Sequence, residues 1–477
     1  MFQCHRLACL TAAASFLAGC AAGPDYVRPP VDAPAAYKEP GQWKAAEPRQ
    51  IDADQQWWKQ YGDARLDALI DEANKANQDI RLAEAQYRAA RGVADAARAG
   101  FYPTVNATAS AGRARSISNG AVNVGNTASV ALTASWEPDL WGSVRRSVES
   151  GTAGAQASSA DLAAARLSVQ AQLAQDYFQL RATDEELDLL ARTVEGYARA
   201  LQLTQHQYAA GIVLRSDVAL ADTQLQTADA QRIDLQAQRA QLEHAIAILL
   251  GRAPAMFTLE KGARVAQVPE TPTGLPSDLL ERRPDIAGAE RRVAQANANI
   301  GVARAAYYPS LLLGATGGLS SGHIAPFLEA PVRVWSLGAA LAETLFDGGL
   351  RAARDEQAVA AYDASVAQYK RTVLGGFQEV EDNLAALRVL DEESAVQERA
   401  VQSSQLSERL ALTQYRGGTA TYLAVIVAQT LALGNERTLV QLRGRQLVAS
   451  VALVRATGGG WAATMLDEHA SAQADSK

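Results

Sequence analysis

Two hydrophobic periods alternate along the chain and divide it into helical and strand segments. Leu173, Leu180, Leu187, Val194 and Leu201 recur every seven residues, a spacing that keeps an apolar seam on one face of a coiled-coil helix. Segments around 104–111 and 127–136 instead alternate polar and apolar residues, which is the period-two pattern of a strand. The sequence therefore predicts long packed helices that are interrupted by pairs of strands.

The whole pattern occurs twice. When the chain is shifted against itself, acidic, basic, proline and glycine positions coincide at an offset of 206 residues, which becomes 207 after a one-residue insertion. The clearest matches are Glu84 with Glu290, Pro103 with Pro309, Gly142 with Gly348, Tyr208 with Tyr415, and Gly211 with Gly418. Because repeats determine architecture before local propensity does, we predict two units, each built as helix, two strands, very long helix, tight turn and long helix.

The predicted segments follow from the repeat and from the prolines. Proline is excluded from helix interiors, and residues 139–253 and 332–477 contain none. We predict a first repeat at 57–255, a linker at 256–277, a second repeat at 278–461 and a tail at 462–477. The strands are expected at about 104–113, 127–137, 310–319 and 332–345, the helical hairpins at about 143–250 and 349–457, and the hairpin tips at 208–218 and 415–425. A helix from Ser143 to Tyr208 would be roughly 90–100 Å long, which an ordinary globular bundle does not need.

Composition removes several classes of function. The chain has 477 residues, of which 48% are hydrophobic, and a net charge of −7, so it lacks the positive field that a nucleic-acid binder needs. Five His and three Cys leave little material for a zinc or thiolate site. Apolar runs outside the N-terminus are also far shorter than a spanning helix requires. We therefore expect no nucleic-acid partner, metal, cofactor or transmembrane helix.

The N-terminal segment is typical of a signal peptide followed by a lipid-anchored cysteine. Arg6 precedes an apolar stretch from Leu7 to Leu17, and the segment ends at Leu17-Ala18-Gly19-Cys20, which resembles a bacterial lipobox. The resemblance implies removal of a signal peptide at 1–19 and acylation of Cys20, with Ala21 in the following position typical of onward sorting to the outer membrane. Six prolines lie in residues 21–50, so we expect 20–56 to be an extended tether.

The strand pairs are consistent with a membrane part. Each segment has about the 9–11 residues that a tilted transmembrane strand needs, with apolar side chains outward and Thr, Ser and Asn inward. Four strands in lipid would leave two edges whose bare amides cost several kcal/mol each, so other chains must complete the sheet. Three chains would supply 3 × 4 = 12 strands and 12 long helices. We predict a mainly α fold with a small membrane β part.

These features together resemble the TolC-type outer-membrane factors, most closely the NodT-type lipoprotein branch. The likeness rests on the lipobox, the duplication, the Trp136–Gly142 segment and the Tyr-x-x-Gly pattern at both turns. It implies a homotrimeric channel-tunnel in which a 12-stranded β-barrel in the outer membrane continues into a 12-helix periplasmic α-barrel. It also implies a passive export duct for small molecules, coupled through a periplasmic adaptor (membrane fusion protein) to an inner-membrane RND transporter, with no catalytic residue.

The two turns carry the candidate functional residues. Gly211 and Gly418 suit the left-handed conformation that ends a helix, and Ser216 and Thr421 suit the cap of the next helix. The resemblance implies that the tips contact the adaptor and that nearby polar residues close a gate. The tip residues are Gly211, Ile212, Val213, Leu214, Ser216, Gly418, Thr419 and Thr421, and the gate candidates are Asp217, Asp222, Tyr415 and Arg416.

Several alternatives stay open at this stage. Family members often carry an acidic ring after the second turn, whereas this chain has Ala424 and Val427, so its ion selectivity is undetermined. The channel could serve an ABC-coupled secretion system instead, or the chain could be a periplasmic coiled-coil scaffold without a pore. Gly318-x-Ser320-x-Gly322, beside His323, matches a hydrolase elbow, but this motif needs a strand–turn–helix setting and lies between two expected strands.

Overall fold

A computed structural model describes residues 21–39, 56–118, 121–262, 268–269, 279–321 and 332–461. These residues form two compact units. The first draws on Met1–Pro30, Gln86–Ser159 and Gly288–Lys370, and the second on Val31–Ala85, Ala160–Ala287 and Arg371–Lys477. The signal peptide, Cys20, His323 and the tail that the sequence predicts lie outside the described residues.

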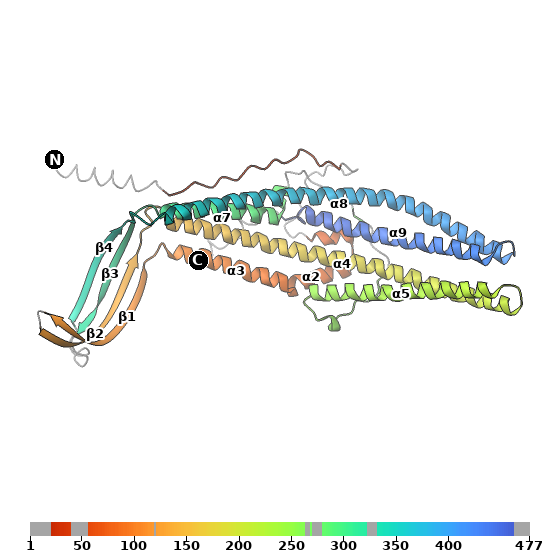
Figure 1. The fold of residues 1–477 in the computed structure, drawn as a ribbon, viewed down its shortest axis with the longest axis horizontal. Coiled ribbons are helices and arrows are strands. Elements are labelled where there is room, and N and C mark those ends of the chain that lie inside the picture. Colours follow the sequence, from red (N-terminus) through yellow and green to blue (C-terminus); the bar gives the residue numbers. More distant parts are fainter. Residues whose placement is uncertain are drawn as a thin grey trace. The chain divides into compact units, whose positions relative to one another are not determined.

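The helices and strands follow the predicted order (Figure 1). The first half contains the short 3-10 helix η1 (Trp57–Tyr61), α2 (Ala64–Ala76), α3 (Gln78–Ala99), β1 (Thr104–Ser118), β2 (Ala121–Trp136), α4 (Ser143–Ala209) and α5 (Arg215–Leu249). The second contains η2 (Pro254–Met256), α6 (Leu279–Arg282), α7 (Pro284–Ala305), β3 (Ser310–Ser321), β4 (Val332–Ala342), α8 (Leu350–Arg416) and α9 (Tyr422–Ala456).

Matching helices of the two halves have equal lengths. α3 and α7 have 22 residues each, α4 and α8 have 67, and α5 and α9 have 35. At about 1.5 Å per residue, each of the longest helices is roughly 100 Å long, far beyond the mean helix of a globular domain. The lengths agree with the repeat that was read from the 206-residue offset.

The four strands form one antiparallel sheet in the order β1-β2-β3-β4. β1 and β2 are longer than the sequence suggested, since their ladder continues from Thr104↔Ser135 to Ser118↔Ala121. The pairing of the two strands does not stop at Gly112 or Arg113, since both residues have partners in β2 and the ladder continues beyond them. β4 is shorter than expected and ends at Ala342, before the charged Glu343 that interrupts the alternation.

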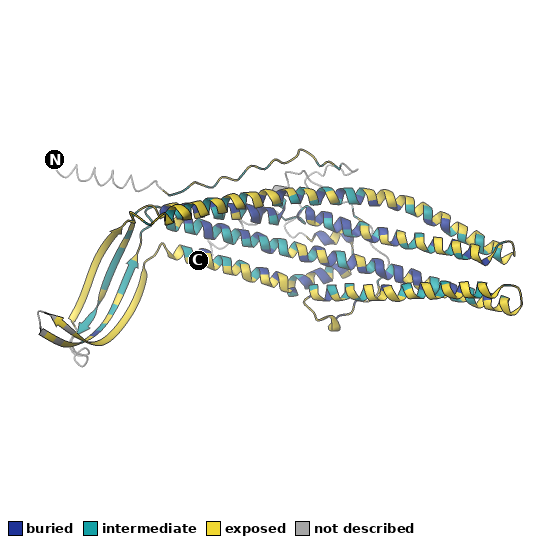
Figure 2. Ribbon diagram, viewed as in Figure 1, coloured by how far each residue is buried: buried dark blue, intermediate teal, exposed yellow. Residues whose placement is uncertain are grey.

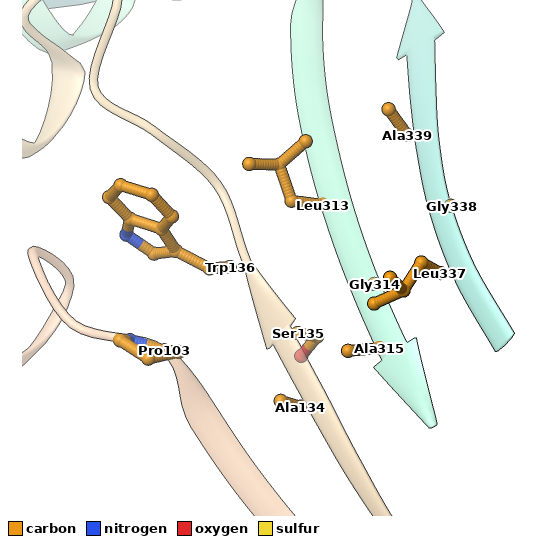
Figure 3. Close-up of a pocket in the computed structure, with 10 residues that line it drawn as sticks. All are labelled: Pro103, Ala134, Ser135, Trp136, Leu313, Gly314, Ala315, Leu337, Gly338 and Ala339. Atoms are coloured by element: carbon orange, nitrogen blue, oxygen red, sulfur yellow. The ribbon is translucent and has the colours of Figure 1, made fainter. Parts of the chain in front are cut away.

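The register gives the sheet two chemically different faces, since directly paired residues project to the same side. One face carries the apolar row Ala134↔Ala315↔Leu337 and its neighbours Trp136↔Leu313↔Ala339 (Figure 3). The other carries the polar row Asn106↔Thr133↔Thr316↔Ser336. On this polar face the hydroxyls of Ser110 and Ser129 are 2.8 Å apart and share a hydrogen bond.

Buried residues are concentrated in the helices, whereas the strands are mostly exposed or half-buried (Figure 2). In the second unit, Tyr177, Phe178, Leu66, Ile70 and Ile246 are almost fully buried. The packing is close at Gly444 of α9, where a Cβ atom would lie 2.7 Å from the Cβ of Ala182 on α4. A Cβ at Gly434, ten residues earlier in α9, would meet nothing within 4 Å.

A buried arginine fixes the start of α7 within the second unit. Arg283 pairs with Asp285 at 2.6 Å and with Glu379 of α8 at 2.8 Å, and its side chain is 8% exposed. It also donates a hydrogen bond to the carbonyl oxygen of Ala456, the last residue of α9. One guanidinium therefore joins α7, α8 and α9.

Residues 21–30 form an extended strap across the first unit. The side chain of Arg146 near the start of α4 donates to the carbonyl oxygens of Ala22 and Gly23 and pairs with Asp25 at 2.8 Å. Farther along, the Tyr26 hydroxyl donates to Glu290 of α7. The strap lies within the tether predicted at 20–56, of which residues 40–55 are outside the described part.

Two further findings bear on the sequence hypotheses. Among the described helices, none has a stretch of 18 residues that is apolar enough to cross a bilayer. The hydrolase interpretation is contradicted, because Ser320 lies inside β3 and pairs with Ser129 and Val332 rather than standing on a strand-to-helix turn.

Candidate functional site at the helical hairpin tips

The two hairpin tips are closed by the same backbone geometry. Gly211 follows α4 with φ +74° and Gly418 follows α8 with φ +72°. In the first tip the amide of Ile212 donates to the carbonyl of Gln207, and in the second the amide of Thr419 donates to that of Gln414, both at 2.9 Å. A left-handed glycine after a helix and a long backward hydrogen bond form a common helix stop, as the sequence predicted.

The start of the returning helix differs from the prediction. α5 begins at Arg215, so Ser216 lies inside the helix rather than capping it. The Asp217 carboxylate accepts the Leu214 amide at 3.1 Å, which satisfies a donor outside the intrahelical ladder. In the second tip Thr421 occupies the cap position of α9, but its side chain makes no capping hydrogen bond. Asp217 therefore has a structural role at the first tip.

An apolar cluster packs the two hairpins together just behind their tips. Ala221 of α5 and Tyr422 and Val425 of α9 are at most 5% exposed and touch one another. Leu201 of α4 and Tyr415 of α8 pack against them, and the rings of Tyr415 and Tyr422 lie 5.3 Å apart. The cluster thus contains residues from all four long helices.

Hydrogen bonds cross between the hairpins beside this cluster. The Tyr415 hydroxyl donates to Gln207 Oε1 of α4 at 2.7 Å. The Gln224 amide of α5 donates to the Tyr197 hydroxyl of α4 at 3.1 Å and to Thr430 Oγ1 of α9 at 2.9 Å. We call the Tyr415–Gln207 and Gln224–Thr430 pairs the tip links.

Farther from the tips, an ion pair joins the hairpins again. Arg437 of α9 pairs with the buried Glu186 of α4 at 2.7 Å and donates to Gln231 of α5 at 3.0 Å. Gln441 donates to the same carboxylate at 3.2 Å. These residues line a polar cavity of about 460 Å³ between α4, α5 and α9. Removing Arg437 would leave the buried Glu186 carboxylate without its cation, which is costly.

Burial changes the ionisation of several groups near the tips. Burial raises the pKa of Tyr415, as does the nearby Asp217 carboxylate, although Thr204 opposes the change. The pKa of Glu408 on α8 is also raised, first by burial and then by the charge of Glu436 on α9. Glu408 therefore retains its proton to a higher pH than a free glutamate does.

The four gate candidates do not form one cluster. Tyr415 lies at the junction of the hairpins, and Asp217 is close enough to influence the charge state of both Tyr415 and Tyr422. Asp222 is exposed and accepts a hydrogen bond only from Gln226 among the interactions seen in the described part. Arg416 is the exposed last residue of α8. The structure thus brings Tyr415 and Asp217 together and leaves Asp222 and Arg416 at the surface.

The remaining tip residues are mostly exposed. Ile212 and Leu214 are 70% and 71% exposed, Val213 is half-buried, and Thr419 donates to the Gln414 carbonyl at 3.1 Å. Ala424 and Val427, which stand where family members often carry acidic residues, are exposed on α9.

Sequence reasoning missed Gln207, Gln224, Thr430 and Arg437. A signal was present close to the repeat offset, because Gln224 and Thr430 are 206 residues apart, as are Gln231 and Arg437. The offset that relates α5 to α9 is 207, so each partner adjoins the repeat equivalent of the other. Two copies of one unit that pack about an axis parallel to their helices bring equivalent positions close together. The offset that revealed the repeat therefore also locates the contacts between its halves.

Comparisons with known proteins agree with this geometry. The family model described as "Outer membrane efflux protein" matches residues 69–252 and 275–459. The chain is 31% identical over 459 residues to the probable efflux pump outer membrane protein TtgC of Pseudomonas putida, with 95% of each chain covered. It is 32% identical over 438 residues to the pyoverdine export outer membrane protein OpmQ of Pseudomonas aeruginosa, covering 88% of this chain and 91% of that one. The solved structure of the outer-membrane channel OprN matches with a TM-score of 0.85 at 32% identity, over 93% of this chain and 100% of that one.

Proposed function

Because the chain belongs to the outer membrane efflux protein family, we propose that three copies assemble into a continuous duct for small molecules. The chain is the outer-membrane channel component of an efflux system and extends into the periplasm. It has a transport role rather than an enzymatic one. The trimer, its partners and its lipid anchor are the parts of the proposal argued below.

The open sheet is the observation that carries the proposal. In the described sheet β1 and β4 are the outer strands, each paired on one side only. Placed in lipid, the free amides and carbonyls of two such edges would cost several kcal/mol each. Closing β4 of one copy on β1 of the next removes both edges, and twelve strands leave room for a water-filled interior that eight do not. The polar face then lines the interior, and the apolar face contacts lipid.

The helices support the same assembly. Leu423, Val427 and Leu431 form a row at every fourth position of α9 and are 56%, 60% and 56% exposed. Such an apolar stripe on a coiled-coil helix fits the flank of another helix. We assign it to a neighbouring copy in a twelve-helix tube.

The partners follow from the exposed tips and the N-terminus. The exposed apolar side chains Ile212 and Leu214 offer a surface for the helical hairpin of a periplasmic adaptor, which would connect the channel to an inner-membrane RND transporter. Acylated Cys20 would anchor the strap in the outer membrane, since more than one lipid chain gives stable attachment. Substrate choice lies with the pump, and the channel contributes a passive path.

We assign the resting closure of the tube to the tip links and the apolar cluster behind them. Opening requires the two hairpins to separate at their ends, which breaks the Tyr415–Gln207 and Gln224–Thr430 hydrogen bonds. Asp217 acts as a cap that keeps the first tip in shape, and Asp222 and Arg416 are free to meet the adaptor or neighbouring copies.

The decisive experiment measures mass and conductance on the same purified sample. We expect a trimer in detergent and ion conductance in planar bilayers, with no catalytic requirement. Mass spectrometry of the N-terminal peptide is expected to show an acylated Cys20, and Cys20→Ser to abolish the acylation but preserve the trimer. A monomer as the sole species, or a trimer without conductance under any condition, would refute the channel assignment.

A further inference from the structure

The outward face of the sheet carries a localised positive charge. Three described residues of the four strands are charged, and all three are arginines: Arg113 and Arg115 of β1 and Arg333 of β4. All three side chains are exposed. In the proposed barrel, charged residues are expected mainly on the face that lines the water-filled interior, because a charge on the lipid face is costly near the bilayer centre.

The register places all three arginines on the apolar face. Arg113 pairs with Asn126 of β2, two residues from Ala128 and four from Val130 on the same side of that strand. Val130 pairs with Leu319, and Leu319 with Arg333. This row is continuous with the face of Trp136, Leu313 and Leu337 (Figure 3). The arginines therefore project toward the lipid side and not toward the interior.

Their position along the strands is also specific. Arg333 is the second residue of β4, and Arg113 and Arg115 are the tenth and twelfth of the fifteen residues of β1, in the half remote from the helices. At the opposite end of the sheet Trp136, which lies on this face, is 37% exposed, and the turns that precede β1 and β3 carry the exposed Tyr102 (72%) and Tyr308 (49%). Such rings favour a membrane–water interface.

The distance between the two borders matches one bilayer. Trp136 and Asn126, the β2 partner of Arg113, are ten residues apart, which is roughly 33 Å along a strand. At a tilt of about 40° this corresponds to about 25 Å across the membrane, the usual height of the apolar band of an outer-membrane barrel. With the aromatic border at the periplasmic interface, Arg113 reaches the headgroups of the outer leaflet.

On this basis, and resting on the proposed channel, we propose that Arg113, Arg115 and Arg333 bind the phosphate groups of a phosphorylated glycolipid in the outer leaflet. Guanidinium groups bind phosphate through two parallel hydrogen bonds, and no acidic side chain of the described strands competes for them. Within one copy the ladder places Arg333 level with Ala109, four residues along β1 from Arg113. Closing β4 on β1 of the next copy would put Arg333 on the strand adjacent to Arg113 and Arg115, so each junction between copies would offer three guanidinium groups to lipid phosphates.

The test is a binding titration of the purified protein with diphosphorylated lipid A, followed by native mass spectrometry. We expect the triple variant Arg113→Gln, Arg115→Gln, Arg333→Gln to bind about a hundredfold more weakly, since each basic residue near an anionic surface contributes about 1 kcal/mol, or about fivefold. The corresponding triple lysine variant is expected to keep most of the affinity. The matched control replaces three exposed helical arginines, Arg88, Arg354 and Arg399, by Gln and is expected to bind as the parent does.

Two further arms identify the ligand. Dephosphorylated lipid A is expected to bind the parent no better than the triple glutamine variant, and inorganic phosphate is expected not to displace the lipid. Equal affinity of the parent and the triple glutamine variant, or displacement by millimolar phosphate, would overturn the proposal. Mass and conductance of each sample are recorded alongside, so that loss of the trimer or the pore is recognised as failure of the channel assignment, whereas the phosphate preference is judged from the titration itself.

Discussion

Replacing Tyr415 by Phe removes one hydroxyl from the junction of the two hairpins and changes little else. The ring keeps its place beside Tyr422 and the apolar cluster, whereas Gln207 loses a donor at 2.7 Å. In the closed state the amide oxygen of Gln207 is then without this partner. In the open state, which has already broken the link, the substitution has no effect on it. The change therefore acts on the closed state alone and favours opening.

The expected size follows from one hydrogen bond per chain. A single intramolecular hydrogen bond contributes about 0.5–1.5 kcal/mol net, so the three copies of the proposed trimer lose about 1.5–4.5 kcal/mol of closure if all three tips open together. This free energy raises the ratio of open to closed channels by about tenfold to about two-thousandfold. The lower bound is already measurable in a recording that counts openings of single channels.

The assay compares single-channel recordings of three variants in planar bilayers. Tyr208→Phe is the matched control, because Tyr208 is the repeat equivalent of Tyr415 but is 46% exposed, and we expect parental behaviour from it. Gln207→Ala is expected to mimic Tyr415→Phe, and the double variant to add little to either, since both remove the same link. An open probability of Tyr415→Phe equal to that of Tyr208→Phe, or full additivity in the double variant, would refute the assignment of this hydrogen bond to the gate.

Three further predictions concern stability and pH. Arg283→Ala removes the buried cation that joins α7, α8 and α9 and leaves the Ala456 carbonyl without its donor. It is expected to cost about 1–3 kcal/mol in denaturant unfolding, because the Asp285 and Glu379 carboxylates are 39% and 43% exposed and can be solvated, compared with no more than about 0.5 kcal/mol for an exposed surface change such as Arg399→Ala. Gly444→Ala is expected to lower the melting temperature, because overpacking costs about 1–3 kcal/mol, whereas Gly434→Ala in the same helix is expected to raise it through better helix propensity; the opposite order would contradict the packing described at Gly444. The pKa of Glu408 in the folded protein is raised above the usual 4.5, because burial favours the protonated carboxyl. The resulting contribution to the free energy of folding is fully present below pH 4.5 and is lost as the pH rises through the folded pKa. Glu408→Gln is therefore expected to raise the melting temperature at pH 8 but not at pH 4, and an equal effect at both pH values would count against this ionisation.

The parts of the fold that could be predicted are those whose sequence signals are local or arise from comparing the two repeats. Heptad spacing, excluded proline and the 206-residue offset located the long helices and their turns, since each is a local or self-comparing property. The strand ends were less accurate at Arg113 and Arg115, where two charged residues on an apolar face look like the end of a membrane strand. Arg113 and Arg115 fit within the strand because the ladder continues beyond them. In the proposed barrel that end of the strand lies at the lipid headgroups, where a charge is not costly. The charge pattern alone did not reveal this.

Prediction of the candidate site was limited by contacts between distant segments. Gly211 and Gly418 were predictable because a helix stop is local. Ser216 was wrongly placed as a cap, since Asp217 accepts the Leu214 amide instead and the helix begins one residue earlier. The Tyr415–Gln207 link joins residues that are 208 positions apart, and only the packing of the two repeats brings them together.

The strap over the first unit has a consequence for the order in which the chain is completed. Its residues are synthesised long before their partners, because Tyr26 donates to Glu290 and Arg28 to the Tyr369 hydroxyl, which lie 264 and 341 positions later in the chain. Contacts of such high sequence separation form late in folding, because the intervening chain must be ordered before they close. The strap can therefore take its place only after α7 and α8 have been synthesised and folded, so its docking marks the completion of the first unit.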